Sequence, residues 1–331
     1  MGSELITFII RRVLFVIPNL ILISIVSFII ILAPPGDILT TRILELQEAY
    51  GSVADEQIAA LRHRYGLDQP ILAQYYKWIK KILFQGDFGM SFEENRPVKE
   101  ILLSRIPPTV LITSVTLLFI YLVAVPIGVY SAVNQYSFFD YVFTFCAFIG
   151  IATPNFLLAL VLMYIFYESF GWSLGGLYSQ GFQGASWSVA KFVDLGKHLV
   201  LPVIVLGTAG TAGLVRVLRG TMLDEMKKAY VQTARSKGLA ERIVVWKHIF
   251  RIAVLPIVST VGWLLPAIIS GEAITSIVLN LPTTGARLLD ALKAQDMYVA
   301  GSFILILSTL TIVGTLISDI LLAALDPRIK Y

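Results

Sequence analysis

Long runs of uncharged, apolar residues are the feature of this 331-residue sequence that most limits its fold. A helix needs about 20 such residues to cross roughly 30 Å of hydrocarbon. Hydrophobic residues make up 56% of the chain and charged residues only 15%, whereas ordinary globular domains carry about 25% charged residues. The runs lack the alternation of apolar and polar residues that marks the strands of a transmembrane barrel. We therefore predict an all-α, polytopic membrane protein with six spans, at Val13–Ala33, Pro108–Val133, Tyr141–Tyr167, Leu199–Val215, Ile252–Gly271 and Tyr298–Ser318.

The distribution of Lys and Arg between the predicted loops indicates how the chain is oriented. Arg11 and Arg12 precede the first span, which predicts a cytoplasmic N-terminus. The segment Arg216–Arg251 holds nine basic and three acidic residues, so it is also expected in the cytoplasm. The segment Pro34–Pro107 holds nine basic and ten acidic residues and is expected outside. Six spans then return the C-terminus to the cytoplasm.

Two segments outside the spans are expected on the external side. Within residues 34–107, Asp55–Tyr65 and Pro70–Leu83 place apolar residues at helical spacing. They predict two amphipathic helices that form a small cap or lie on the membrane surface. Glu168–His198 is rich in Gly and Ser and is predicted to be an external loop with aromatic anchors.

Catalytic and metal-binding patterns are not found in the sequence. There is no G-x-x-x-x-G-K-[ST] phosphate loop and no H-E-x-x-H pair. The single Cys146 excludes a disulfide within the chain. The net charge of +4 is small and dispersed, which argues against a nucleic-acid partner. We expect a chain that is not an enzyme by itself and carries no cofactor or metal.

The basic cytoplasmic segment has a regular helix–glycine–helix pattern. Met222–Gly238 is predicted to be a helix ended by Gly238 in the C-cap region. A second helix is expected from about Ala240, and Leu255-Pro256 then redirects the chain into the fifth span. The apolar stripe predicted for this second helix consists of Ile243, Val244, Ile249 and Ile252.

Small residues in the first of these helices, Thr233 and Ala234, would let a partner approach closely. The alternative is a solvated basic loop that only sets the topology. That alternative explains the Lys and Arg residues but not the helix–glycine–helix pattern.

These residues resemble a known motif. Gln232-Thr-Ala-Arg-Ser-Lys-Gly238 with Leu255-Pro256 downstream is similar to the EAA loop of ABC importer permeases. Tyr230–Leu239 resembles more closely the version in the dipeptide/oligopeptide/nickel branch. Further blocks of that branch occur in family order along the whole chain, at Pro35-Gly-Asp37, Tyr65-Gly-Leu-Asp-Gln-Pro70, Gly86-Asp-Phe-Gly-Met-Ser91, Pro108-Thr109 and Leu325-Asp-Pro-Arg328.

The resemblance implies the type I importer permease fold, in a bacterial or archaeal inner membrane. The implied regions are an N-terminal helix (1–33), an external helical insertion (34–107), a permease core (108–325) with the EAA loop at 222–256, and a cytoplasmic tail (326–331). The implied partners are a second, homologous permease subunit, two ATP-binding cassette subunits that carry ATP and Mg²⁺, an extracytoplasmic substrate-binding protein and membrane lipid. The coupling residues that the motif implies are Tyr230, Gln232, Thr233, Ala234, Arg235, Gly238, Leu239, Leu255 and Pro256.

The sequence departs from the family pattern at two places. Gln232 and Thr233 stand where the general motif has Glu and Ala, and the close branch also varies there. After the fifth span, Ser276 and Pro282-Thr-Thr-Gly285 replace an acidic residue and a Pro-Gly-x-Gly turn. The second departure lies on the expected substrate side, so a particular cargo cannot be carried over. Peptides, glutathione, nickel complexes and oligosaccharides stay open, although the spans lack the His/Cys/Met cluster that would suit a bare metal ion.

Two other classes compete with the importer. A self-contained channel or secondary carrier would be expected to show an intramembrane acid–base pair or an inverted repeat, and neither is evident. A membrane scaffold would not need the helix–glycine–helix pattern.

One acidic residue, Glu272, follows the fifth span. A carboxylate that faces lipid at the bilayer centre costs about 2.5–3.5 kcal/mol. Glu272 is therefore expected to face a partner subunit, the pathway or the outer interface; the alternative is a carboxylate that simply reaches external water.

Overall fold

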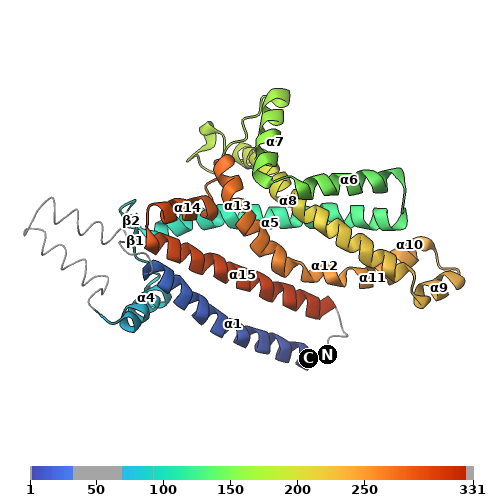
Figure 1. The fold of residues 1–331 in the computed structure, drawn as a ribbon, viewed down its shortest axis with the longest axis horizontal. Coiled ribbons are helices and arrows are strands. Elements are labelled where there is room, and N and C mark those ends of the chain that lie inside the picture. Colours follow the sequence, from blue (N-terminus) through green and yellow to red (C-terminus); the bar gives the residue numbers. More distant parts are fainter. Residues whose placement is uncertain (1, 33–68, 92, 326–331) are drawn as a thin grey trace, which may run out of the picture. The chain divides into compact units, whose positions relative to one another are not determined.

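The structure is a computed structural model that describes residues 2–32, 69–91 and 93–325. Apart from one hairpin of two strands, each two residues long, the regular elements in these ranges are helices (Figure 1). The fold is all-α, as predicted. In chain order the elements are α1 (Gly2–Leu32), α4 (Ile71–Gln85), β1 (Met90–Ser91), β2 (Arg96–Pro97), α5 (Val98–Val133), α6 (Phe138–Ala152), α7 (Asn155–Phe170), the 3₁₀ turn η2 (Gln180–Phe182), α8 (Val189–Met226), α9 (Ala229–Ser236), α10 (Glu241–Ile243), the π-helical η3 (Val244–Ile249), α11 (Phe250–Ala253), α12 (Leu255–Ser259), α13 (Val261–Val278), α14 (Thr284–Lys293) and α15 (Met297–Leu325).

Five helices of the described ranges are long and apolar enough to cross a membrane: α1, α5, α8, α13 and α15. A sixth crossing is available if α6 and α7 together form one broken span. This agrees with the predicted polytopic class. The bounds of the fifth predicted run, Ile252–Gly271, are wrong, because the short helices α11 and α12 precede the membrane-length helix α13, which extends to Val278.

The third predicted span, Tyr141–Tyr167, is wrong as a single straight helix. The chain bends by 112° between α6 and α7, at Thr153-Pro154. A residue before proline is forced out of the helical region, and Thr153 is extended with φ −89° and ψ 122°. Its N–H and hydroxyl both bond the Ile149 carbonyl, at 3.0 and 2.8 Å, so the break leaves that carbonyl doubly satisfied.

Two helices begin earlier than their apolar runs. α5 starts at Val98 rather than Pro108, and α8 starts at Val189, inside the segment predicted to be an external loop. The extension of α8 includes polar residues that find partners. Asp194 accepts the Ser179 N–H at 2.8 Å and its hydroxyl at 2.6 Å, and the Lys191 ammonium donates to the Ala185 carbonyl at 2.5 Å. Because these polar side chains are hydrogen-bonded, the helix continues through them. The start of the uncharged run therefore does not mark the start of α8.

The described chain divides into two compact units. The first contains the described residues of the ranges 1–12, 109–282 and 311–331, and α8 is packed there against α6, α7 and α13. Gly207 and Gly210 of α8 allow close packing on α5, because an added Cβ would lie 2.6 Å from Phe119 and 2.7 Å from Ile120. These contacts agree with the close packing that small residues permit between membrane helices.

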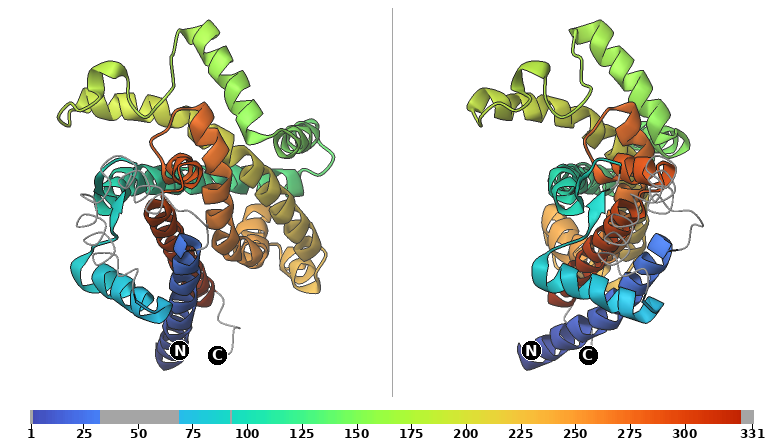
Figure 2. Two further views of the ribbon diagram at one scale, coloured as in Figure 1. Left: turned by 60° about the vertical axis from the view of Figure 1, so that its left-hand side comes forward. Right: turned by 90° about the vertical axis from the view of Figure 1, so that its left-hand side faces the viewer.

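The second unit contains the described residues of the ranges 13–108 and 283–310. Its two apolar clusters centre on Phe303 and on Trp78. The boundary of the units within α5 falls at Pro108, where proline removes a backbone donor from the helix. In this unit α4 lies across the C-terminal end of α1 (Figure 2).

The helix predicted over Pro70–Leu83 is confirmed as α4, which ends at Gly86 in the left-handed conformation (φ 60°). The expected partner helix Asp55–Tyr65 and the turn after Ala33 lie outside the described residues. The regions 1–33, 34–107, 108–325 and 326–331 remain predictions.

Candidate functional site

The candidate site is the segment between α8 and α12, residues 227–254, which we call the elbow. The expected helix–glycine–helix arrangement is present, but the helix predicted over Met222–Gly238 is broken in two. α8 ends at Met226, Lys228 is extended (φ −70°, ψ 147°), and α9 begins at Ala229. The break turns α9 back on the protein and buries Val231 completely. Burial of an apolar side chain therefore competes successfully with continuation of the helix.

Gly238 ends α9 in a Schellman motif. Its φ of +73° lies in the left-handed region. Its N–H donates to the Arg235 carbonyl at 2.9 Å, and the Leu239 N–H donates to the Ala234 carbonyl at 3.4 Å. These are the two bonds that define the motif, so the predicted role of Gly238 is confirmed. No atom lies within 4 Å of an added Cβ, and glycine is needed here for conformation and not for space.

An ion pair closes the turn around Gly238. The Arg235 guanidinium donates to both carboxylate oxygens of Glu241, at 3.1 and 2.6 Å. The hydrogen bond from Arg235 lowers the pKa of Glu241, and the same bond raises the pKa of Arg235. Both side chains are about half exposed, so the pair contributes less than about 1 kcal/mol. The pair links the last turn of α9 to the start of α10, on the two sides of Gly238.

The inner face of the elbow belongs to the core of the first unit. Val231, Ala234, Val244, Val245 and Ile249 are buried in the same apolar cluster. Ala234 is only 6% exposed. Its small side chain packs within the chain's own core, and the expectation that a partner approaches closely at Ala234 stays a prediction.

The second helix of the elbow also differs from its prediction. Ile243, placed on the apolar stripe by α-helical spacing, is 45% exposed, while Val244 and Ile249 are fully buried. The cause is the π-helical winding of η3, whose longer turn brings residues five apart onto one face. Single π turns are frequent at functional sites.

The outer side of the elbow carries both polar and apolar side chains. Gln232 and Thr233 are exposed, as are Arg235 and Gly238. Its exposed apolar residues are Tyr230, Leu239, Ile243 and Trp246, with 36 to 48% of each side chain accessible. The Trp246 ring lies 5.0 Å from that of Phe250. Exposed aromatic residues on a preformed surface are typical anchors of protein interfaces.

The elbow is tied to the long helices at both ends. The Tyr230 hydroxyl donates to Glu225 of α8 at 2.7 Å, and the Thr221 hydroxyl of α8 donates to the Ala253 carbonyl of α11 at 3.1 Å. Leu255-Pro256 was expected to lead directly into the fifth span; it opens instead the five-residue helix α12, which precedes α13, with proline in the first turn where no N–H is needed.

Glu272 lies in α13 and is fully buried in the chain. The Ser276 hydroxyl donates to its carboxylate at 3.4 Å. The alternative of a carboxylate that reaches external water is therefore wrong. Ile268, one turn before Glu272, lines an apolar cavity of about 170 Å³, together with Asn155 and Trp263. A pathway or interface role for Glu272 stays a prediction.

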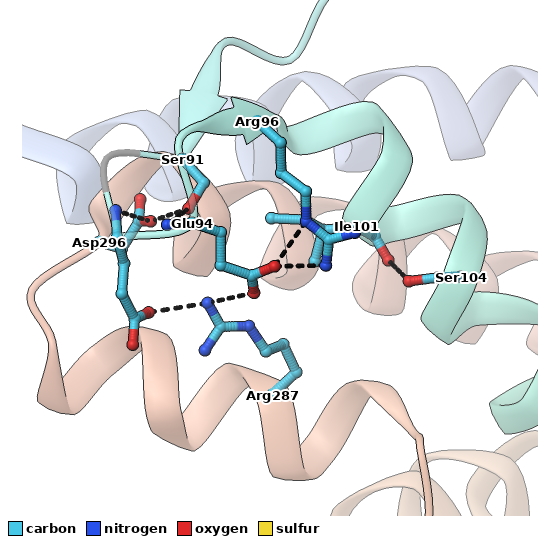
Figure 3. Close-up of polar contacts among 8 residues, drawn as sticks. Ser91, Glu94, Arg96, Ile101, Ser104, Arg287 and Asp296 are labelled. Carbon is cyan, nitrogen blue, oxygen red and sulfur yellow. Dashed lines mark hydrogen bonds and ion pairs between the residues drawn. The ribbon is translucent and has the colours of Figure 1, made fainter.

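A polar cluster that sequence reasoning missed lies in the second unit (Figure 3). Arg287 of α14 forms ion pairs of 2.7 Å with both Glu93 and Glu94, and its side chain is 8% exposed. The Ser91 hydroxyl donates to the fully buried Asp296 at 2.5 Å. Burial raises the pKa of Asp296 despite that hydrogen bond. The partners are about 200 residues apart, so the only sequence signal was the family block that ends at Ser91.

These features define the class of the protein: a multi-pass helical membrane protein with a projecting, preformed elbow. The chain matches the family model described as "Binding-protein-dependent transport system inner membrane component" over residues 124–331. It also matches the N-terminal model of such membrane components over residues 5–113. The chain belongs to this family. It is thus an inner-membrane transport subunit without a catalytic domain or cofactor, and ATP hydrolysis is carried by separate subunits.

Curated relatives cover the chain from end to end. It is 38% identical to the oligopeptide transport system permease protein AppB of Bacillus subtilis, over 98% of this chain and 99% of that protein. It is 33% identical to the dipeptide transport system permease protein DppB of Alkalihalophilus pseudofirmus, over 97% and 98% of the two chains. It is also 33% identical to the glutathione transport system permease protein GsiC of Salmonella choleraesuis, over 99% of this chain and 100% of that one.

Replacement of Gly238 tests the turn. Gly238→Val puts a β-branched residue at φ +73°, which costs about 1–2 kcal/mol. Hydrogen exchange of the amides in 229–243 should accelerate about tenfold. Gly220→Ala is the control, because Gly220 is exposed, has open space for a Cβ and is not left-handed. Equal protection in the two variants would contradict the conformational role.

Two arginine variants test the difference between the polar clusters. Arg287→Ala removes a buried guanidinium that bonds two partly exposed carboxylates and should cost about 1–3 kcal/mol of stability. Arg235→Ala breaks an exposed pair and should cost less than about 1 kcal/mol. Thermal unfolding of the purified protein in detergent compares them. The assignment fails if both variants lose the same stability.

Proposed function

We propose that this chain is one of the two membrane subunits of an ATP-driven importer for peptide-like solutes. Its partners would be a second, homologous permease subunit, two ATP-binding cassette subunits and an extracytoplasmic substrate-binding protein. The family match supports the transport role. The oligopeptide, dipeptide and glutathione systems in which its relatives act support the substrate class.

We propose that the elbow is the contact with a cytoplasmic ATPase. This proposal rests on the structure of the elbow. A left-handed turn at Gly238 is bridged by the ion pair of Arg235 and Glu241, and exposed apolar side chains lie beside it. A contact that transmits motion must hold its shape under load, and a preformed surface also lowers the cost of binding. Tyr230, Gln232, Thr233, Arg235, Gly238 and Leu239 would form or shape the contact, while Ala234 positions it from inside.

Movement of the elbow would reach the membrane helices directly. Tyr230 and Thr221 connect it to α8 by hydrogen bonds, and Leu255-Pro256 leads through α12 to α13. Closure of the ATPases would therefore displace α8 and α13 together. In this way the chain would alternate the access of the pathway between the two sides.

The proposed orientation places the elbow and both termini in the cytoplasm. It is supported by the surplus of six basic residues in 216–251 (nine basic less three acidic). In this arrangement residues 34–107 form the external insertion and residues 108–325 the permease core.

Two tryptophan variants test the coupling proposal. Trp246 of the elbow is 48% exposed, and Trp187, in the segment proposed to be external, is 69% exposed. Loss of an aromatic anchor from an interface costs about 2 kcal/mol, or roughly 30-fold in affinity. Trp246→Ala should therefore weaken ATPase association about 30-fold and reduce ATP-driven peptide uptake, at unchanged membrane insertion.

The control variant, Trp187→Ala, removes the same side chain away from the elbow and should leave ATPase association unchanged. Association is measured by titration of purified ATPase onto the permease pair in nanodiscs. Equal affinities of the two variants would refute the elbow as the ATPase contact.

A further inference from the structure

A small cavity beside α4 has the chemistry of a phosphate site. It has a volume of about 50 Å³ and lies within the second unit. Lys77 and Lys81 of α4 are four residues apart and share one helix face. Asp87 is the carboxylate among the lining residues, and it accepts the Gly89 N–H at 2.9 Å. The lining therefore has a surplus of positive charge and consists of Phe28, Gln74, Lys77, Trp78, Lys81, Asp87, Gly89 and Tyr298.

Trp78 provides an independent sign of a ligand at this place. The residue is 7% exposed and lines the cavity. Its indole N–H has no hydrogen-bond partner in the structure as described for residues 2–32, 69–91 and 93–325. A buried donor without an acceptor is unfavourable, and a buried tryptophan normally finds one. An anionic oxygen in the cavity would supply it after a small shift of the side chains that now cover the indole nitrogen.

The position of α4 on α1 indicates which phase the cavity faces. Tyr75 bonds Ser24 of α1 at 2.7 Å, and the rings of Tyr75 and Trp78 both lie 5.5 Å from that of Phe28. Phe28 is four residues from the end of α1 at Leu32, or about 6 Å at the helical rise. Because α1 is long and apolar enough to span a membrane, contact with its C-terminal end would put α4 near the level where hydrocarbon meets the headgroups.

The surface of α4 suits this level. Five large hydrophobic residues of α4 are left 63 to 81% exposed: Ile71, Leu72, Tyr76, Leu83 and Phe84. Lysines 77, 80 and 81 lie on the same short helix. Apolar residues combined with basic residues on one amphipathic helix are typical of helices in the membrane interface.

We propose that this cavity binds the phosphate of an anionic phospholipid, from the leaflet in which α4 lies. Lys77 and Lys81 pair with the phosphate oxygens, and the Trp78 N–H donates to one of them. The acyl chains cover the exposed apolar residues of α4. The site would hold α4 against α1 through a lipid. It depends on the membrane location of the chain and not on its cargo or its ATPase.

The test uses the assembled transporter, purified and delipidated, and titrated with phosphatidylglycerol while native mass spectrometry counts the bound lipid. One basic residue near a membrane surface is worth about a fivefold change in affinity. The Lys77→Gln/Lys81→Gln variant should therefore bind about 25-fold more weakly. Trp78→Phe keeps the ring, removes the donor and should bind about tenfold more weakly. Lys80→Gln is the matched control, because Lys80 lies over the Tyr76 ring at 5.8 Å and does not line the cavity.

Three results would overturn the proposal. In the first, the double-lysine variant binds phosphatidylglycerol as tightly as Lys80→Gln does. In the second, millimolar inorganic phosphate displaces the lipid, which would identify a free anion as the occupant. In the third, phosphatidylcholine binds as tightly as phosphatidylglycerol. Thermal unfolding of each variant separates a loss of lipid binding from a loss of folding.

Discussion

The bilayer offers no hydrogen-bond partner to the polypeptide backbone, and the rest of this structure depends on that constraint. Within hydrocarbon every N–H and C=O must be satisfied by the chain itself, so the apolar segments are helices. A break in a helix frees carbonyls from their helical donors. Before Pro154, Thr153 still makes the last helical bond of α6 to the Ile149 carbonyl and adds its hydroxyl to that carbonyl, while proline has no N–H for the Gly150 carbonyl.

The elbow satisfies the carbonyls at the end of a helix from within the chain. Its Schellman turn satisfies the carbonyls of Ala234 and Arg235 with the N–H groups of Leu239 and Gly238. The turn is therefore complete without any partner chain. Because Val231 and Ala234 are buried beneath it, the outer surface rests on the same core that holds α8. A surface built in this way can receive a force on one side and pass it to the membrane helices on the other.

Much of this arrangement follows from local sequence, and the limits are equally physical. Five spans can be predicted from the sequence, because an uncharged run of about 20 residues is stable in lipid only as a helix. The role of Gly238 is readable because few residues tolerate φ +73°. The inward orientation of Ala234 was not readable, because the break at Lys227-Lys228 resets the phase of α9. The pairs of Arg287 with Glu93 and Glu94 could not be derived either, since nothing local joins residues about 200 positions apart.

The central claim is that the elbow lies in the cytoplasm and is covered by an ATPase. Accessibility of single cysteines to an impermeant maleimide tests it directly, in a Cys146→Ser background. Ser236 of the elbow and Ser186 of the loop before α8 are both exposed and serve as the two positions. Ser186→Cys should react in right-side-out vesicles. Ser236→Cys should react only in inverted vesicles, and faster once the ATPase subunits are stripped. Labelling of Ser236→Cys in right-side-out vesicles, or labelling unaffected by the ATPase, would contradict the account.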